Sequence, residues 1–148
     1  MDISEAQTRF DAGAWRTIQS SRKLAACRQI EAALYHLHLG GFECAVTLAL
    51  AAEGQLPETD ATTLWNALKR HRSDKEYLSL INDLRDWLKH LKEPDQRDIS
   101  EFEAVIALVR ATTKYFATFN EETADMQAFI RWCVSKQVFW SEGAPAGR

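Results

Sequence analysis

The sequence contains few residues that interrupt helices, with only six glycines and three prolines among 148 residues. Alanine, leucine, glutamate, lysine and arginine, which favour helix, are frequent instead. A sheet-rich fold needs many tight turns, and glycine and proline supply most of them. Their scarcity therefore argues against a β-protein and predicts an all-α fold.

Cysteine is also scarce, and no C-x-x-C pair occurs. The three cysteines, Cys27, Cys44 and Cys133, are an odd number, and each lies in an apolar helical context. This pattern excludes a disulfide framework and the paired spacing of a structural zinc site. We expect buried, reduced thiols, as in cytoplasmic proteins.

Neither a leader nor a membrane span is visible. The N-terminal residues MDISEAQTRFDAG carry acids where a secretory signal has basic and apolar residues. The longest apolar stretch, FECAVTLALAAEG, includes Glu43 and Glu53 and is too short to cross a bilayer. We expect a cytoplasmic protein without a membrane partner.

The chain has no overall attraction for nucleic acid, because its net charge is −3. Any RNA contact must come from a local basic patch, and one dense cluster occurs in residues 69–75, KRHRSDK. A solvated turn is the alternative interpretation. The candidate RNA-binding residues are Lys69, Arg70, Arg72 and Lys89. No phosphate-binding glycine loop, nucleophile elbow or metal-ligand spacing is present, so no cofactor and no metal are expected.

Apolar periodicity predicts an antiparallel bundle of about five or six helices with short connections. Five predicted helices span residues 21–39, 42–56, 76–92, 100–119 and 122–139, preceded by a weakly patterned one at 4–17 and interrupted by a short one around 64–68. We expect one all-α domain over residues 1–140 and a disordered tail over 141–148.

Several residues fix the expected helix ends and packing. Gly40 and Gly41 should stop the second helix, and Ser100 with Glu103 forms a capping-box signature. The 42–56 helix carries small residues every three or four positions, which places it near the centre of the bundle. These are Ala45, Ala49 and Ala52. The expected core face of the 100–119 helix is Phe102, Ile106, Val109, Thr113 and Phe116.

The 76–92 helix contains a candidate site for chemistry on phosphates, NDLRDWLKH at residues 82–90. Histidine transfers protons near neutral pH, and arginine stabilises charge on phosphate oxygens. On a regular helix Arg85 and His90 lie about 140° apart around the axis. They can meet only if the helix unwinds before Pro94 or if a second copy of the chain completes the site.

Neighbouring residues support the candidate pair. Asp86, four residues before His90, can orient its imidazole, and Asn82 shares the polar face of Arg85. The alternative is that all four residues form the solvated side of a helix.

The stretch RDWLKH resembles the R-[polar]-x3-H signature of the HEPN superfamily of small helical bundles. Together with LHLGGFECAVTLALAAEG, it also looks like a group of uncharacterised bacterial helical proteins associated with that superfamily. The resemblance implies a homodimer or pseudo-dimer whose two motifs face each other. Position 92, where toxin-type members often carry tyrosine, is Lys92.

Catalytic members of the superfamily are metal-independent endoribonucleases, many of them in toxin–antitoxin or defence systems. The resemblance implies that Arg85 stabilises phosphate charge and that His90 moves protons, supported by Asp86 and Asn82. It also implies RNA as substrate and an antitoxin or other protein as partner. Other members bind ligands or partners without catalysis, and that alternative stays open here.

Three further residues suggest a different binding site. The favoured interpretation puts Glu43 and Glu53 on the exposed edge of their helix, and the alternative makes them inward-facing acids of a pocket with His36. His36 and His38 point about 200° apart and cannot chelate one metal. Trp87 lies off the main apolar stripe, so we expect a dimer contact there.

Overall fold

The computed structural model describes residues 2–58 and 74–136, and every regular element in these two segments is an α-helix. This confirms the all-α prediction. The helices are α1 (Ile3–Asp11), α2 (Arg22–Leu39), α3 (Phe42–Gly54), α5 (Asp74–Lys89), α6 (Glu101–Phe119) and α7 (Ala124–Ser135). The predicted short helix at 64–68 and the tail at 141–148 lie outside the described residues.

Local signals set the ends of α2 and α6 as expected. The Ser21 hydroxyl accepts a hydrogen bond from the backbone N–H of Leu24 at 3.0 Å, and Gly40 ends α2 in the left-handed conformation at φ 81°. The capping box of α6 is complete. The N–H of Glu103 donates to the Ser100 hydroxyl, and the Glu103 carboxylate accepts from the N–H of Ser100.

The first helix is shorter than predicted. It ends at Asp11 instead of residue 17, because Gly13 turns the chain at φ 68° and residues beyond it are not helical. Its N-cap is Asp2, whose carboxylate accepts from the N–H of Ser4 at 2.9 Å. The 76–92 helix also ends early, at Lys89.

The centre of the bundle is α6. Residues 103–109 are buried without interruption, so the helix is enclosed on every side, and it contacts α2, α3 and α5. The predicted core residues Phe102 and Phe116 are instead 37% and 40% exposed. Both lie outside the enclosed part of α6, at residues 103–115, where the neighbouring helices no longer cover it.

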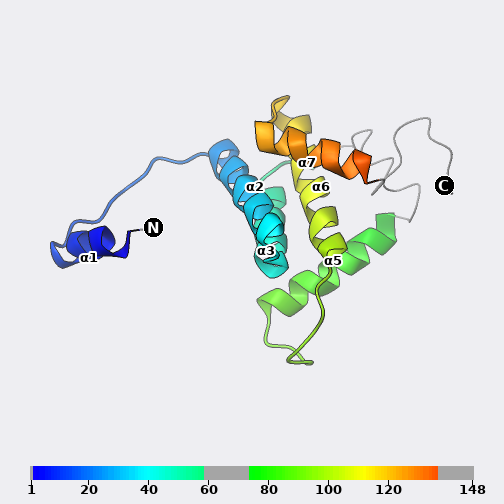
Figure 1. Cartoon of the computed structure of the whole chain (residues 1–148), viewed down its shortest axis with the longest axis horizontal. Helices are drawn as coiled ribbons and strands as arrows, with labels where there is room; N and C mark the ends of the chain where they lie inside the picture. Colours follow the sequence, from blue (N-terminus) through cyan, green and yellow to red (C-terminus); the bar gives the residue numbers. More distant parts are fainter. Residues whose placement is uncertain (1, 59–73, 137–148) are drawn as a thin grey trace.

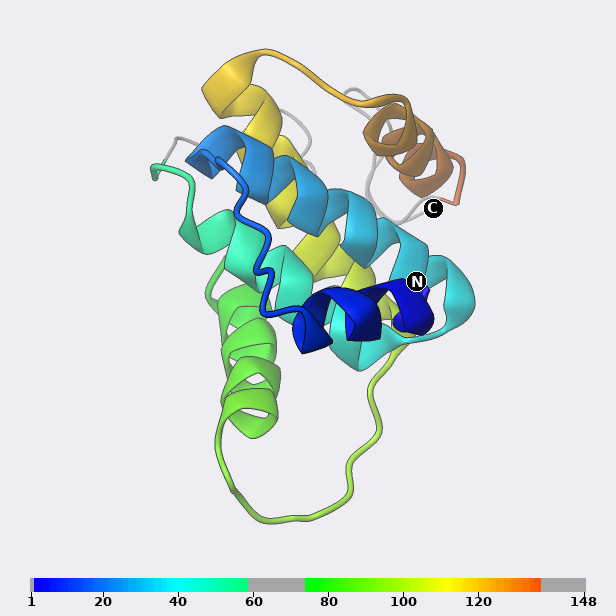
Figure 2. The ribbon, with the colours of Figure 1, turned by 90° about the vertical axis from the view of Figure 1, so that its left-hand side faces the viewer.

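The α3 helix packs closely on its neighbours through its alanines. Ala45, Ala49 and Ala52 have no exposed surface, as expected for a helix that others approach closely. The α2 and α3 helices form an antiparallel pair joined at Gly40 and Gly41. In Figures 1 and 2 they run alongside α6, while α5 crosses below and α7 lies above.

Not all connections are short. Residues 90–100 form a long loop between α5 and α6, contrary to the expected compact turns. Two contacts hold it: the indole N–H of Trp87 donates to the carbonyl of Pro94 at 2.8 Å, and Arg97 pairs with Glu103 at 3.3 Å. The loop is therefore fastened to both helices that it joins.

The first helix stands apart from the bundle. Figure 1 shows α1 at the end of an extended segment, residues 12–21, that leads to α2. No residue of α1 is buried. Within the described part of the chain, no helix combines the length and the apolar composition that crossing a membrane requires.

Replacing the α6 cap should destabilise the protein. We expect Ser100→Ala to lower the free energy of unfolding by about 1 kcal/mol, because an N-terminal N–H of α6 loses its acceptor. Urea titration measures the change. Ser79→Ala, at an exposed position inside α5, is the control and should change stability by less than about 0.5 kcal/mol. Equal effects of the two substitutions would contradict a capping role.

The three thiols should differ in reactivity, because only Cys133 is buried; Cys27 is half-buried and Cys44 exposed, contrary to the expected burial of all three. Burial raises the pKa of Cys133 to about 12. In native protein at about pH 8, iodoacetamide should alkylate Cys44 and leave Cys133 unmodified, since the thiolate is the reactive form. Peptide mass mapping reads this out, and equal labelling rates would refute the assignment.

Candidate functional site

The Arg85–His90 motif occupies the C-terminal end of α5, on the side away from the bundle. Ile81 and Leu84 are buried against the core, whereas Asn82 and His90 are exposed. The Arg85 side chain is 41% exposed. The motif therefore lies on a surface that RNA or a second protein can reach.

Within the motif, the Asp86 carboxylate lies against arginine instead of histidine. Its Oδ1 is 3.6 Å from a guanidinium nitrogen of Arg85, and no ion pair between Asp86 and the His90 ring occurs among the described residues. This differs from the expected orientation of His90 by Asp86. The carboxylate instead fixes the guanidinium in a partly solvated pair.

The helix does not unwind before His90. The backbone N–H of His90 donates to the carbonyl of Asp86 at 3.0 Å, the bond of a continuing α-helix. Arg85 and His90 therefore remain about 140° apart around the axis, and one chain does not bring them together. The α5 helix ends at Lys89, before Pro94 but after the turn that separates the two side chains, and convergence through a second copy stays a prediction.

A shallow groove of about 630 Å³ lies beside the motif. Its apolar walls are Phe42, Trp87, Leu88 and Ile99, and its charged residues are Glu43, Arg97 and Asp98. Trp87 is half-buried and bonded to its own loop through Pro94. The indole therefore has a hydrogen-bond partner within its own chain. From the sequence we expected Trp87 to contact a second chain.

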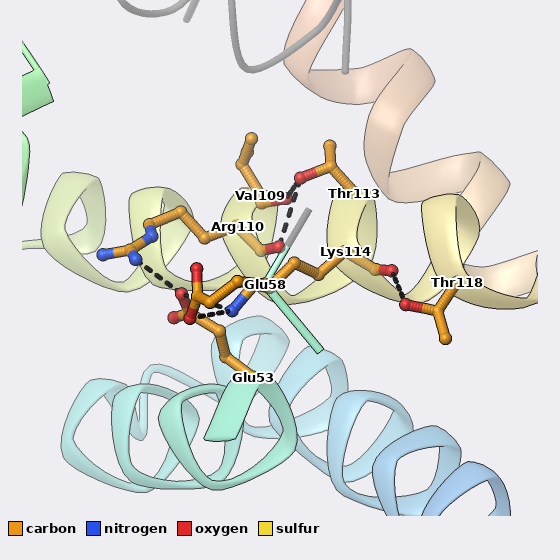
Figure 3. Close-up of polar contacts among 7 residues, drawn as sticks. All are labelled: Glu53, Glu58, Val109, Arg110, Thr113, Lys114 and Thr118. Carbon is orange, nitrogen blue, oxygen red and sulfur yellow. Dashed lines mark hydrogen bonds and ion pairs between the residues drawn. The ribbon is translucent and has the colours of Figure 1, made fainter. Parts of the chain in front are cut away.

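Figure 3 shows a second cluster, where Glu53 of α3 meets α6. Glu53 is only 7% exposed, and its Oε1 lies 2.5 Å from Arg110 and 3.6 Å from Lys114. Lys114 also reaches Glu58 at 3.0 Å. The expectation of an exposed edge was wrong for Glu53, because α3 packs with this face on α6 and two cations compensate the buried carboxylate.

Sequence reasoning missed Arg110 and Lys114. A signal was present, since the two cations stand four residues apart in a helix that is otherwise apolar around them. A buried acid in α3 and two cations in α6 are the expected composition of an ion-paired helix contact. Only the tertiary structure shows that they face each other.

The three residues of the alternative pocket do not share one cavity. Glu43 is exposed, as the favoured interpretation held, and lines the groove beside Trp87. Glu53 is ten residues further along α3, about 15 Å away along the axis. His36 is half-buried at the end of α2, where its ring contacts Tyr35. Glu53 thus lies apart from Glu43, and the three side chains do not form one pocket.

The candidate RNA-binding residues are only partly described. Lys89 is exposed at the end of α5, next to the motif. Lys69, Arg70 and Arg72 lie outside the described residues. Among the described side chains, no three histidine, cysteine, aspartate or glutamate groups are placed to hold one metal ion.

A half-buried acid, Glu31, joins α2 to the start of α7. The hydroxyl of Thr123 donates to the carboxylate of Glu31. Burial raises the pKa of Glu31, and the neighbouring Asp125 raises it further. The hydrogen bond between Thr123 and Glu31 holds the start of α7 against α2. The two residues are far apart in sequence, so no local pattern indicates their contact.

Comparison of the chain with protein-family models, with curated proteins and with solved structures found no match.

Removing the Glu53 carboxylate should strongly destabilise the bundle. We expect Glu53→Ala to lower the free energy of unfolding by about 3 kcal/mol, because the largely buried Arg110 and Lys114 lose the anion that compensates them. Denaturant titration measures the loss. Glu58→Ala is the matched control, since the Glu58 side chain is 94% exposed and should contribute little. Similar losses in both variants would contradict the buried pairing.

Proposed function

We propose that this chain is a HEPN-like helical protein that acts as a homodimer and cleaves RNA without a metal ion. Arg85 of one copy and His90 of the other form each active site. The observation that carries the proposal is the position of the motif. Its arginine and histidine are accessible at the end of α5, and the unbroken helix keeps them apart within one chain.

The chemistry follows from the two side chains. The ribose 2′-hydroxyl attacks the adjacent phosphorus, and the bond from phosphorus to the 5′-oxygen of the next nucleotide breaks. His90 transfers protons in this exchange, and Arg85 stabilises the negative charge that grows on the phosphate oxygens. Asp86 holds the guanidinium of Arg85 from the side, at 3.6 Å.

The surroundings of the motif suit a nucleic-acid backbone. Lys89 is exposed one turn after Arg85, so both cations lie on one side of the helix. Asn82, also exposed, precedes Arg85 by one turn and adds a hydrogen-bonding amide. The carboxylate of Asp86 pairs with Arg85, and that of the exposed Asp83 lies about 160° from Arg85 around the axis. Both confine favourable phosphate contacts to these few groups.

The groove beside Trp87 favours a second candidate function, a non-catalytic bundle that binds a ligand or a partner protein. Phe42 and Trp87 offer aromatic surface for such a ligand, and Glu43 and Asp98 offer hydrogen-bond acceptors. In that case the only role of Arg85 is its ion pair with Asp86. Cleavage assays separate the two candidates.

The proposal predicts metal-independent cleavage that depends on both side chains. Wild-type protein incubated with mixed RNA in EDTA should cleave it, while Arg85→Ala and His90→Ala should each lower the rate by about 100-fold or more. His38→Ala, which removes another exposed histidine, is the control. Circular dichroism should show unchanged helicity in all variants.

Mixing the two inactive variants tests whether the active site is shared between copies. A heterodimer of Arg85→Ala and His90→Ala chains has one site with both wild-type residues and one with neither. After free subunit exchange, about a quarter of the wild-type activity should return. Wild-type cleavage without any recovery on mixing would place both residues in one chain. No cleavage by the wild type would leave the non-catalytic candidate.

A further inference from the structure

The N-terminal arm, residues 2–18, exposes more large apolar side chains than a free segment of this length should. Ile3 is 75% exposed, Phe10 60%, Trp15 76% and Ile18 66%. Phe10 and Trp15 contact each other edge to face, with ring centroids 5.2 Å apart. Even with this contact, most of the surface of both rings is exposed to solvent.

The arm is organised as a binding element. Ile3, Ala6 and Phe10 follow one another at three- and four-residue spacing, so they share one side of α1. A carboxylate cap fixes the helix start. An amphipathic helix that buries no residue in its own chain has its apolar side free for another molecule.

A complementary surface exists on α2. Leu24, Tyr35 and Leu39 are 37%, 62% and 60% exposed, and their spacing places them on the side of α2 that faces away from the core. The stripe from Leu24 to Leu39 is about 22 Å long, enough for the nine residues of α1 and the aromatic side chain that follows. No described helix covers it.

The net charges of the two helices are opposite. With its cap Asp2, α1 carries three acids, Asp2, Glu5 and Asp11, against one partly exposed base, Arg9. The bases of α2 are Arg22, Lys23 and Arg28, against one partly exposed acid, Glu31. An acidic helix therefore meets a basic one, which favours this pairing over contacts between two copies of the same surface.

We infer that the arm of each copy docks on the α2 stripe of a second copy, so that two chains exchange arms. The non-helical chain after Trp15, residues 16–21, permits this, since six residues span up to about 20 Å. The exchange is symmetric, with each copy giving an arm and receiving one. In the single chain α1 buries nothing, although α2 follows it directly in sequence, so its binding surface lies on another molecule.

The area is sufficient for a stable dimer. The side chains of Ile3, Phe10 and Trp15 bury about 400 Å² per arm, and two arms with their two binding surfaces bury on the order of 1,600 Å². Specific, stable interfaces begin at about 1,200 Å². The inference is independent of RNA cleavage, because its test measures the mass of the protein assembly in solution.

Charge reversal tests the exchange in full-length protein. One variant carries Glu5→Lys with Asp11→Lys, and the other carries Arg22→Glu with Arg28→Glu. All four positions are exposed, so the bundle should stay folded, as circular dichroism will show. Each variant alone sets like charges against each other, and its dimer dissociation constant should rise about tenfold or more. Sedimentation velocity over a concentration series measures it.

Mixing the two variants is the decisive step. In a mixed dimer each basic arm meets an acidic α2 and each acidic arm meets a basic α2, so dimers should return. Glu93→Lys with Asp95→Lys makes the same change in charge in the 90–100 loop, and it should leave the wild-type dimer unchanged. A monomeric wild type, or variants that dimerise as tightly as the wild type, would overturn the inference. Variants that stay monomeric on mixing would overturn it too, because the arm would then contact its own chain.

Discussion

The packing of α3 on α6 is the contact on which the rest of the structure depends. Ala45, Ala49 and Ala52 are short enough to let the two backbones come close, and α6 is enclosed as a result. The close approach of α3 and α6 also shields the Glu53 side chain from solvent. Arg110 and Lys114 reach this carboxylate from α6 and compensate its burial.

This contact also positions the candidate site. The α5 helix touches α3 and α6 through one side only, that of Ile81 and Leu84, so its other side carries the motif in solvent. Because the 90–100 loop is fastened at both ends, α5 cannot rotate freely relative to α6. Arg85 and His90 thus point in separate directions, about 140° apart around the α5 axis.

Two surfaces of the chain carry our proposals. The motif on α5 reaches solvent, and the arm with the α2 stripe leaves large apolar side chains in water. Both proposals assign these surfaces to the association of two identical chains. They remain separable, because one concerns the placement of charged side chains for catalysis and the other the burial of apolar area.

The sequence by itself determined the helical class, the caps at Ser21 and Ser100 and the stop at Gly40. Each depends on a few adjacent residues whose hydrogen bonds and dihedral angles are local. Only the tertiary structure decided that Glu53 is buried and that Phe102 and Phe116 reach solvent. Those outcomes depend on which helix faces which, and residues such as Glu53 and Arg110, far apart in sequence, meet only after the helices have packed.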